Sequence, residues 1–347
     1  MLTERQEHIL RLIIQNYTTT GNPVGSKKLM EEGISASSAT IRNDMKVLEE
    51  QGLIQKTHSS SGRIPSLHGY RYYVDHLLRP TKVDPSEMNV IRHSFGKEFH
   101  EINEIVQQSA EILSQLTSYT AFSLGPDIRE RRLTGFRIVP LNDRQIIAII
   151  VTDKGNVESQ VFTIPISVSA GDLEKMVNII NDRLVGEPLM TVYHRLRTEI
   201  PMILHRYFQT PEGMMDLFDS ILGNAFEEKI FVSGKMNLLD YEPQQNLQQF
   251  KSMYSFMKDM DELTQLLTPG DGAIQIRIGN EIGNELLNNM SLIQASYEIE
   301  GHGRGTIALL GPTSMPYSRM FGLVDVFRRE LAEKLAEYYR SLDLPNR

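Results

Sequence analysis

Residues 37–52 read SSATIRNDMKVLEEQG and predict one amphipathic helix, with a serine as its N-cap and a glycine after its end. At about 100° per residue, three apolar side chains share one face: Ile41, Met45 and Leu48. The opposite face is small and polar near its start, so it can enter the major groove of DNA and offer hydrogen-bond donors to base edges. We expect this helix to contact DNA through Ser37, Ser38, Thr40, Arg42, Asn43 and Lys46.

The segments on either side predict a winged helix-turn-helix domain over residues 1–79. One helix is expected from Glu4 to the stop signal at Gly21, and a second, shorter helix over 26–32. Residues 53–65 contain two strand-like pieces around a Ser/Gly turn, which indicates a hairpin, or wing. The wing is expected to hold phosphates through Lys56, His58, Ser60 and Arg63.

Charge both supports and opposes this interpretation. The net charge of the whole chain is -8, but residues 1–79 carry ten basic and eight acidic side chains, so this head is +2 and the remainder -10. A mildly basic head on an acidic body is typical of a DNA-reading domain joined to a part that does not touch DNA. Glu49 and Glu50 oppose phosphate contact unless they point away from the DNA backbone. Three surface helices with a solvated hairpin remain the alternative.

Composition excludes several classes of protein. There is no cysteine, so disulfides, thiolate catalysis, iron–sulfur clusters and cysteine zinc sites are excluded, and we expect a cytoplasmic, reducing environment. No stretch approaches the roughly 18 apolar residues of a membrane span, and the N-terminus lacks a signal-peptide pattern. We therefore expect no membrane association.

Three motifs resemble known protein families in their residues and not only in their helix or strand periodicity. ATIRNDM (39–45) followed by LEEQGLI (48–54) resembles many bacterial winged-helix regulators. HSSSGRIPS (58–66) with GYRYYVD (69–75) resembles specifically the heat-inducible transcription repressor family, HrcA. GPTSMPY (311–317) resembles the closing motif of that family, although residues 314–316 depart from its usual form.

The resemblance implies a dimeric transcription repressor of heat-shock chaperone operons. Such a repressor binds an inverted-repeat operator in double-stranded DNA, is released on heat stress and is kept active by chaperonin. A different function stays open: a metabolite-responsive winged-helix repressor with a ligand-binding GAF-like domain. An increase in melting temperature with one metabolite would favour that alternative.

The remaining pattern predicts an α+β multidomain fold. Residues 80–127 form a linker and the first part of a GAF-like α+β domain, 228–347 form its remainder, and 128–227 form an inserted α+β unit that the resemblance makes the dimerisation domain. The insert starts with an antiparallel meander. Strands are expected over 119–124, 133–139, 145–151, 157–164, 229–234, 273–278, 292–299 and 305–310, and helices over 86–119, 170–184, 190–208 (interrupted at Pro201), 212–228, 250–267 and 317–342.

The segment after the wing carries tyrosines beside basic residues. Tyr70 and Tyr73 could stack on nucleic acid, but we favour packing of residues 67–78 back onto the head. Residues 79–85 contain two prolines and predict an extended linker.

No catalytic, metal or cofactor site is expected. GHGRG (301–305) lies between two predicted strands and indicates a hairpin turn rather than a phosphate loop. His93 and His100 share a predicted helix without a third ligand, and no nucleophile-elbow motif occurs. The chain is therefore not expected to be an enzyme.

Overall fold

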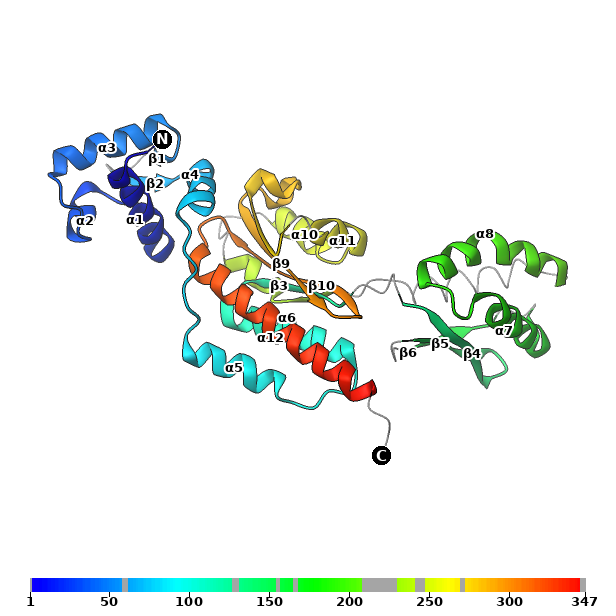
Figure 1. The fold of residues 1–347 in the computed structure, drawn as a ribbon. Helices are drawn as coiled ribbons and strands as arrows, with labels where there is room; N and C mark the ends of the chain where they lie inside the picture. Colours follow the sequence, from blue (N-terminus) through cyan, green and yellow to red (C-terminus); the bar gives the residue numbers. More distant parts are fainter. Residues whose placement is uncertain are drawn as a thin grey trace. The chain divides into compact units, whose positions relative to one another are not determined.

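The computed structural model describes residues 2–57, 62–126, 131–153, 157–164, 168–207, 230–240, 247–268 and 272–343. These residues form two compact units (Figure 1). Unit 1 comprises Met1–Leu124, Ile230–Tyr297 and Gly305–Lys334, and unit 2 comprises Gly125–Lys229, Glu298–Arg304 and Leu335–Arg347. Within the described ranges, no helix has the length and apolar character needed to cross a bilayer.

The head of unit 1 has the predicted helices and hairpin, with bounds within a residue of those expected. Thr3 caps the first helix through a capping box, and Gly21 ends it with φ 66°. The apolar stripe Ile41, Met45 and Leu48 is buried, as its spacing predicts. The elements are α1 (Glu4–Thr20), α2 (Ser26–Glu31), α3 (Ser38–Glu50), β1 (Ile54–Lys56) and β2 (Arg63–Pro65).

A connecting segment follows the wing and packs on the long helix α12 (Tyr317–Asp343) as well as on the head. It consists of α4 (Leu67–Tyr72) and a π-helical turn, η1 (Tyr73–Leu77). The ring centroids of Tyr70 and Tyr317 are 5.7 Å apart, and the hydroxyls of Tyr73 and Ser318 are 2.7 Å apart. The expected packing on the head is therefore only part of the contact, because these tyrosines are also buried against a helix about 245 residues further along the chain.

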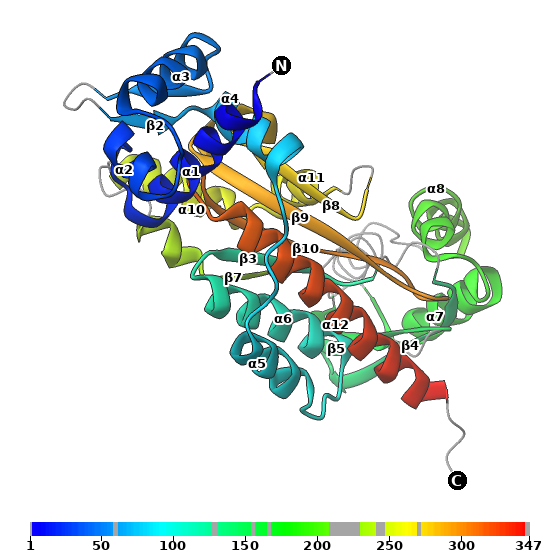
Figure 2. The same ribbon diagram turned by 60° about the vertical axis from the view of Figure 1, so that its left-hand side comes forward.

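The linker is extended, as predicted, and lies along α12 (Figure 2). The backbone N–H of Thr81 donates to the carbonyl of Ser318 at 3.0 Å. Gly322 permits this close approach, because a Cβ there would lie 2.1 Å from the carbonyl oxygen of Thr81.

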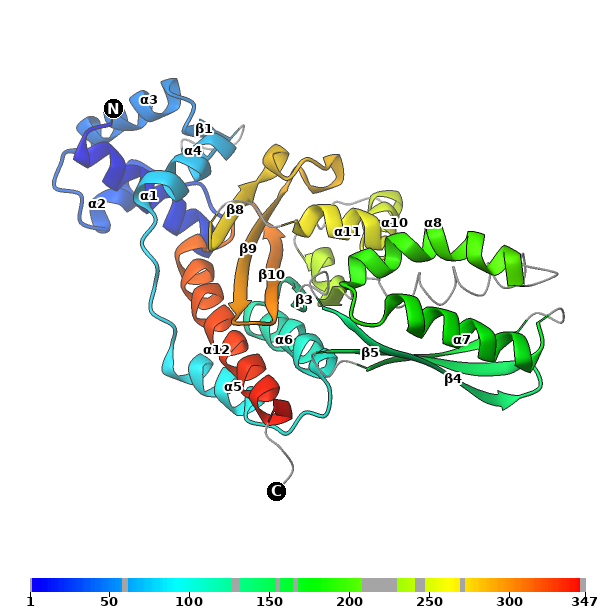
Figure 3. The same cartoon turned by 45° about the vertical axis from the view of Figure 1, so that its right-hand side comes forward.

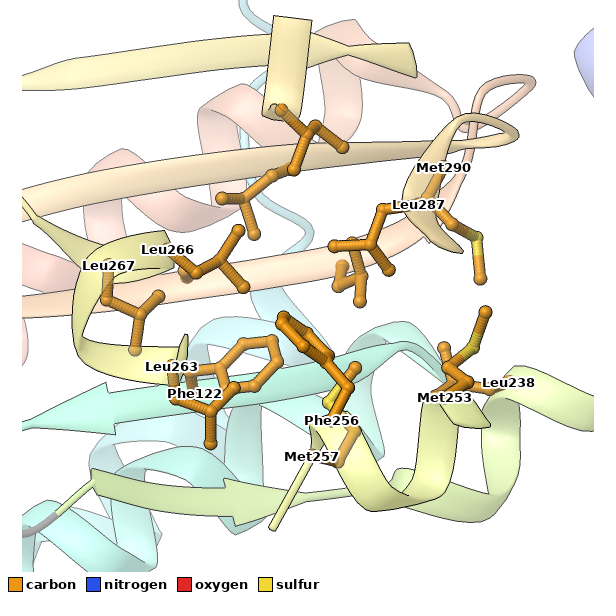
Figure 4. Packing of buried hydrophobic residues seen from close by; sticks show 14 of the residues in the cluster. Phe122, Leu238, Met253, Phe256, Met257, Leu263, Leu266, Leu267, Leu287 and Met290 are labelled. Atoms are coloured by element: carbon orange, nitrogen blue, oxygen red, sulfur yellow. The ribbon is translucent and has the colours of Figure 1, made fainter. Parts of the chain in front are cut away.

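A five-stranded sheet forms the body of unit 1, in the order β7-β3-β10-β9-β8. One face is covered by α6 (Ile102–Thr117) and α12, where Ser109 bonds Ser123 and Ser291 bonds Tyr317 (Figure 3). The other face packs against α10 (Leu247–Phe256) and α11 (Met260–Leu267) in an apolar core (Figure 4). The strands are β3 (Thr120–Leu124), β7 (Ile230–Ser233), β8 (Ile274–Ile278), β9 (Met290–Ile299) and β10 (Gly303–Pro312).

Unit 2 contains the predicted antiparallel meander: β4 (Leu133–Asn142), β5 (Gln145–Thr152) and β6 (Val157–Thr163). Two helices, α7 (Ala170–Leu184) and α8 (Leu189–Tyr207), pack with one face of this sheet in a single apolar core. The opposite face carries Val139, Val157 and Val161, whose side chains are between 43% and 57% exposed.

Four expectations about helices need correction or lie outside the described residues. Residues 86–119 form two helices, α5 (Pro85–Phe95) and α6, so His93 and His100 do not share a helix. Residues 250–267 are also two helices, because Asp259 caps the N-terminus of α11. Helix α8 continues through Pro201 instead of being interrupted. The helix expected over 212–228 lies outside the described residues.

The described residues also contain short 3₁₀ helices that the sequence pattern does not predict: η2 (Lys235–Asp240), η3 (Gly279–Ile282) and η4 (Glu285–Leu287). The start of the GHGRG segment lies in the turn between β9 and β10, as predicted, and its last three residues begin β10. Gly301 in the turn has φ 73°, and Gly303 at the start of β10 has φ 95°.

Candidate nucleic-acid interface

Helix α3 is fixed to α1 by a buried carboxylate. Nε of Arg5 donates to Asp44 at 2.7 Å, and Nε2 of Gln6 donates to the same carboxylate at 3.3 Å. The Asp44 side chain is only 9% exposed, and a carboxylate at that depth requires a partner. Helical periodicity does not predict this pair, although an aspartate between Ile41 and Met45 on a buried face is a signal for one.

The turn between α2 and α3 is closed by hydroxyl groups. Ser37 caps α3 by accepting from the backbone N–H of Thr40 at 3.2 Å, as predicted. The hydroxyl of Ser38 lies 2.9 Å from that of Ser26, and Nε of Arg42 donates to Ser26 at 3.3 Å. Ser38 thus joins the two helices, while Arg42 is held through its Nε and remains exposed.

The outward face of α3 is open, as the spacing predicts: Ala39, Arg42, Asn43 and Lys46 are exposed. This face borders a groove of about 1170 Å³ between the start of α2, α3 and the wing. The groove brings together five of the ten predicted DNA-contacting residues, four of them cationic. It is lined by Gly25, Ser26, Lys27, Arg42, Asn43, Met45, Lys46, Glu49, Glu50, Lys56 and Arg63.

The wing places its two cations side by side. Lys56 on β1 is directly opposite Arg63 on β2, and the backbone of Arg63 also pairs with Val24 through two hydrogen bonds of 2.8 and 2.9 Å. His58 and Ser60, the other predicted wing residues, lie outside the described residues.

An acidic side chain of α3 reaches these wing cations. Oε2 of Glu49 lies 2.8 Å from Nη2 of Arg63, and its Oε1 lies 3.9 Å from Nζ of Lys56. Arg63 is 12% exposed at this pair, whereas Lys56 is 62% exposed. The groove therefore contains five cationic and two acidic side chains and is net positive, but Glu49 stands at its wing side.

Comparison with known proteins agrees with this geometry. The DeoR-like helix-turn-helix domain matches residues 5–64, which span α1 to β2. The HrcA protein C terminal domain matches residues 103–321, more than half of the chain. The chain belongs to the HrcA family.

Relatives that match over nearly their whole length carry the name of the same family. The chain is 72% identical over 345 residues to the heat-inducible transcription repressor HrcA of Enterococcus faecalis, and the match covers 99% of both chains. It is 67% identical over 343 residues to the repressor of that name from Tetragenococcus halophilus, again over 99% of both. The chain is thus a heat-inducible transcription repressor with an N-terminal helix-turn-helix DNA-binding domain.

One solved structure has a similar fold over nearly the whole chain. It is described as the crystal structure of a hypothetical protein at 2.2 Å resolution, with a TM-score of 0.60 at 24% identity, covering 97% of this chain and 98% of that one. This likeness concerns the fold alone. Among the described residues, no group of three or more His, Asp or Glu side chains could hold a metal ion.

Proposed function

We propose that the repressor reads its operator with the first half of α3 and holds the phosphate backbone with the groove beside it. The observation that carries this proposal is the open polar face of α3 bordering a net-positive groove. Asn43 is exposed at mid-helix and has the donor and acceptor needed for a bidentate contact to adenine. Arg42 and Thr40 would flank it, and Lys46, one turn further, would reach a phosphate.

Not all the predicted residues suit the same role. The hydroxyls of Ser37 and Ser38 are engaged in capping and in the α2–α3 contact, so we assign them to positioning α3 and to backbone contact. The more exposed Lys56 is a better phosphate ligand than Arg63, whose guanidinium already bonds Glu49. His58 and Ser60 stay predictions for the tip of the wing.

We infer that the repressor acts as a homodimer, because a two-fold protein matches an inverted-repeat operator. The open face of the β4–β6 sheet supports the insert, residues 128–227, as the dimerisation domain. Val139 and Val161 both oppose Ile147 of β5 in register, so apolar side chains form a continuous row across the three strands. A second copy of this face would cover the row and remove it from water.

The regulation is proposed on the family resemblance. The repressor would act in the cytoplasm on heat-shock chaperone operons, release its operator on heat stress and depend on chaperonin for activity. The GAF-like assignment of residues 80–127 and 228–347 belongs to the same proposal.

The experiment is fluorescence anisotropy with an inverted-repeat chaperone-operator duplex and a scrambled duplex of equal length, titrated with salt. Asn43→Ala should cost about 1–3 kcal/mol on the operator and little on the scrambled duplex. Lys46→Ala, on the same face of α3, should weaken both duplexes alike and reduce the salt slope by about one. Equal affinity of the unmodified repressor for both duplexes would overturn the operator-reading proposal.

Chaperonin dependence is tested in the same assay. After a heat step, operator binding should recover when chaperonin is added and should not recover with an equal mass of albumin. Recovery in both samples would contradict a specific role of chaperonin.

A further inference from the structure

We propose that Glu49 is an internal competitor of DNA phosphate: its carboxylate occupies the wing cations Lys56 and Arg63 and so sets how tightly the repressor holds DNA. This inference rests on the proposed function, since it assumes that the groove between α3 and the wing faces the DNA backbone. Glu49 thus affects the affinity for DNA, whereas the exposed face of α3 determines the sequence preference.

The contacts of Glu49 support this role. Nε of Arg63 donates to Oε2 of Glu49 at 3.0 Å, and Nη2 of Arg63 lies 2.8 Å from the same oxygen. Nζ of Lys56 is 3.9 Å from the other carboxylate oxygen. One carboxylate thus bridges both strands of the wing. The oxygens of a phosphate would take similar positions between a guanidinium and an ammonium group.

Burial makes this pair stronger than the neighbouring surface pairs. The side chain of Glu49 is 28% exposed and that of Arg63 is 12% exposed, so solvent and salt screen their attraction only partly. Glu50, the next residue, is 63% exposed and lies 3.6 Å from Lys46, which is 73% exposed. Such a pair contributes little, so Glu50 has the same charge and lines the same groove without holding the wing.

The position of Glu49 also decides which part of DNA binding it affects. It lies near the C-terminal end of α3, whereas the residues proposed to read bases lie in the first half of the helix. Phosphate contacts supply affinity without sequence information. Glu49 should therefore lower the affinity for every duplex by a similar factor, which keeps a repressor that must release its operator from binding too tightly.

The test compares Glu49→Gln with the matched control Glu50→Gln in the full-length repressor. The amide that replaces the Glu49 carboxylate can still accept a hydrogen bond from Arg63, but the negative charge is gone. Glu49→Gln should tighten both operator and scrambled duplexes by roughly two- to fivefold, the size of one partly exposed ion pair. The salt slope should steepen by about one, and the ratio of the two affinities should stay unchanged. Glu50→Gln should change each quantity less.

A double-mutant cycle shows whether the effect passes through the wing. In a Lys56→Gln background, Glu49→Gln should gain less affinity than it does alone, because one of the two competed cations is missing. Thermal melts of every variant verify that the head remains folded.

Four outcomes separate the possibilities. If Glu49→Gln and Glu50→Gln behave alike, or if the folded Glu49→Gln variant binds both duplexes more weakly, the competitor role is wrong. An altered ratio of the two affinities would instead make Glu49 part of base recognition and would also overturn the assignment. If the unmodified repressor does not prefer its operator, the proposed function fails before this inference is reached.

Discussion

The five-stranded and three-stranded sheets differ in how completely the described residues cover them. The five-stranded sheet of unit 1 has helices on both faces, and six consecutive residues of β9, from Met290 to Ala295, are buried. The three-stranded sheet of unit 2 has helices α7 and α8 on one face, and burial along β5 alternates between buried and half-buried residues.

From Ile146 to Val151, the residues of β5 are apolar at both the buried and the half-buried positions. Its sequence is QIIAIIVT, and the half-buried positions are Ile147, Ile149 and Val151. A continuous apolar run is typical of a strand that is buried on both faces. The apolar composition of β5 suits a strand covered on both faces, whereas the described residues cover one face fully. This difference is the physical reason to expect a second copy on the other face.

The largest expected effect is in the sheet that is covered on both faces. Phe122 is fully buried in the core between β3 and α10–α11. Phe122→Ala should lower the free energy of unfolding of unit 1 by about 3–5 kcal/mol, because it removes a large ring and leaves a cavity. Hydrogen exchange of the β3 and β10 amides under increasing urea measures this loss. A decrease below about 1 kcal/mol would show that the core collapses around the site.

The covered face of β5 should be nearly as sensitive. Ile146 is 0% exposed and packs in the core with α7 and α8. Ile146→Ala should destabilise unit 2 by about 2–5 kcal/mol, which exchange of the β4–β6 amides would detect. Protection equal to that of the unmodified chain would contradict the described core.

A substitution on the open face of the β4–β6 sheet should change self-association rather than the free energy of unfolding. Val161→Glu introduces a charge on β6 where the side chain is 51% exposed, so the unfolding free energy should change by less than about 0.5 kcal/mol. If a second copy covers this face, the dimer dissociation constant should rise at least about tenfold, since a buried unpaired charge is costly. Analytical ultracentrifugation measures this shift.

The control is the neighbouring residue on the same strand. Successive side chains point to opposite faces, so Gln160→Glu adds the same charge on the other side of the sheet. It should leave self-association unchanged. Equal dimerisation of both variants would place the dimer interface elsewhere.

The smallest effect is expected for a hydroxyl contact between α6 and β3. The hydroxyl of Ser109 lies 2.7 Å from both Ser123 and the carbonyl of Val106, and both serines are fully buried. After Ser123→Ala, Ser109 retains its bond to Val106, so unit 1 should lose only about 0.5–1.5 kcal/mol. Urea denaturation measures the difference, and a loss above about 3 kcal/mol would show that the Ser123 hydroxyl has a further role.

Much of the head could be predicted from local signals. The N-caps Thr3 and Ser37, the glycine stop at Gly21 and the stripe from Ile41 to Leu48 all depend on neighbours within one or two helical turns. The same holds for the meander of unit 2 and for the glycine turn before β10. Errors arose where a long helical pattern hid a break, as at Asp259, because periodicity alone does not show where one helix ends and the next begins.

The helix and strand periods, the caps, the turns and the exposed polar face of α3 follow from the sequence alone, because each depends on residues close together along the chain. The partner that each side chain meets follows only from the packing of the folded chain. Glu49 binds the wing, Asp44 binds Arg5, and Tyr73 bonds Ser318 across 245 positions. Such pairs depend on how distant elements pack, and the spacing of charges or rings along the chain carries no record of that packing.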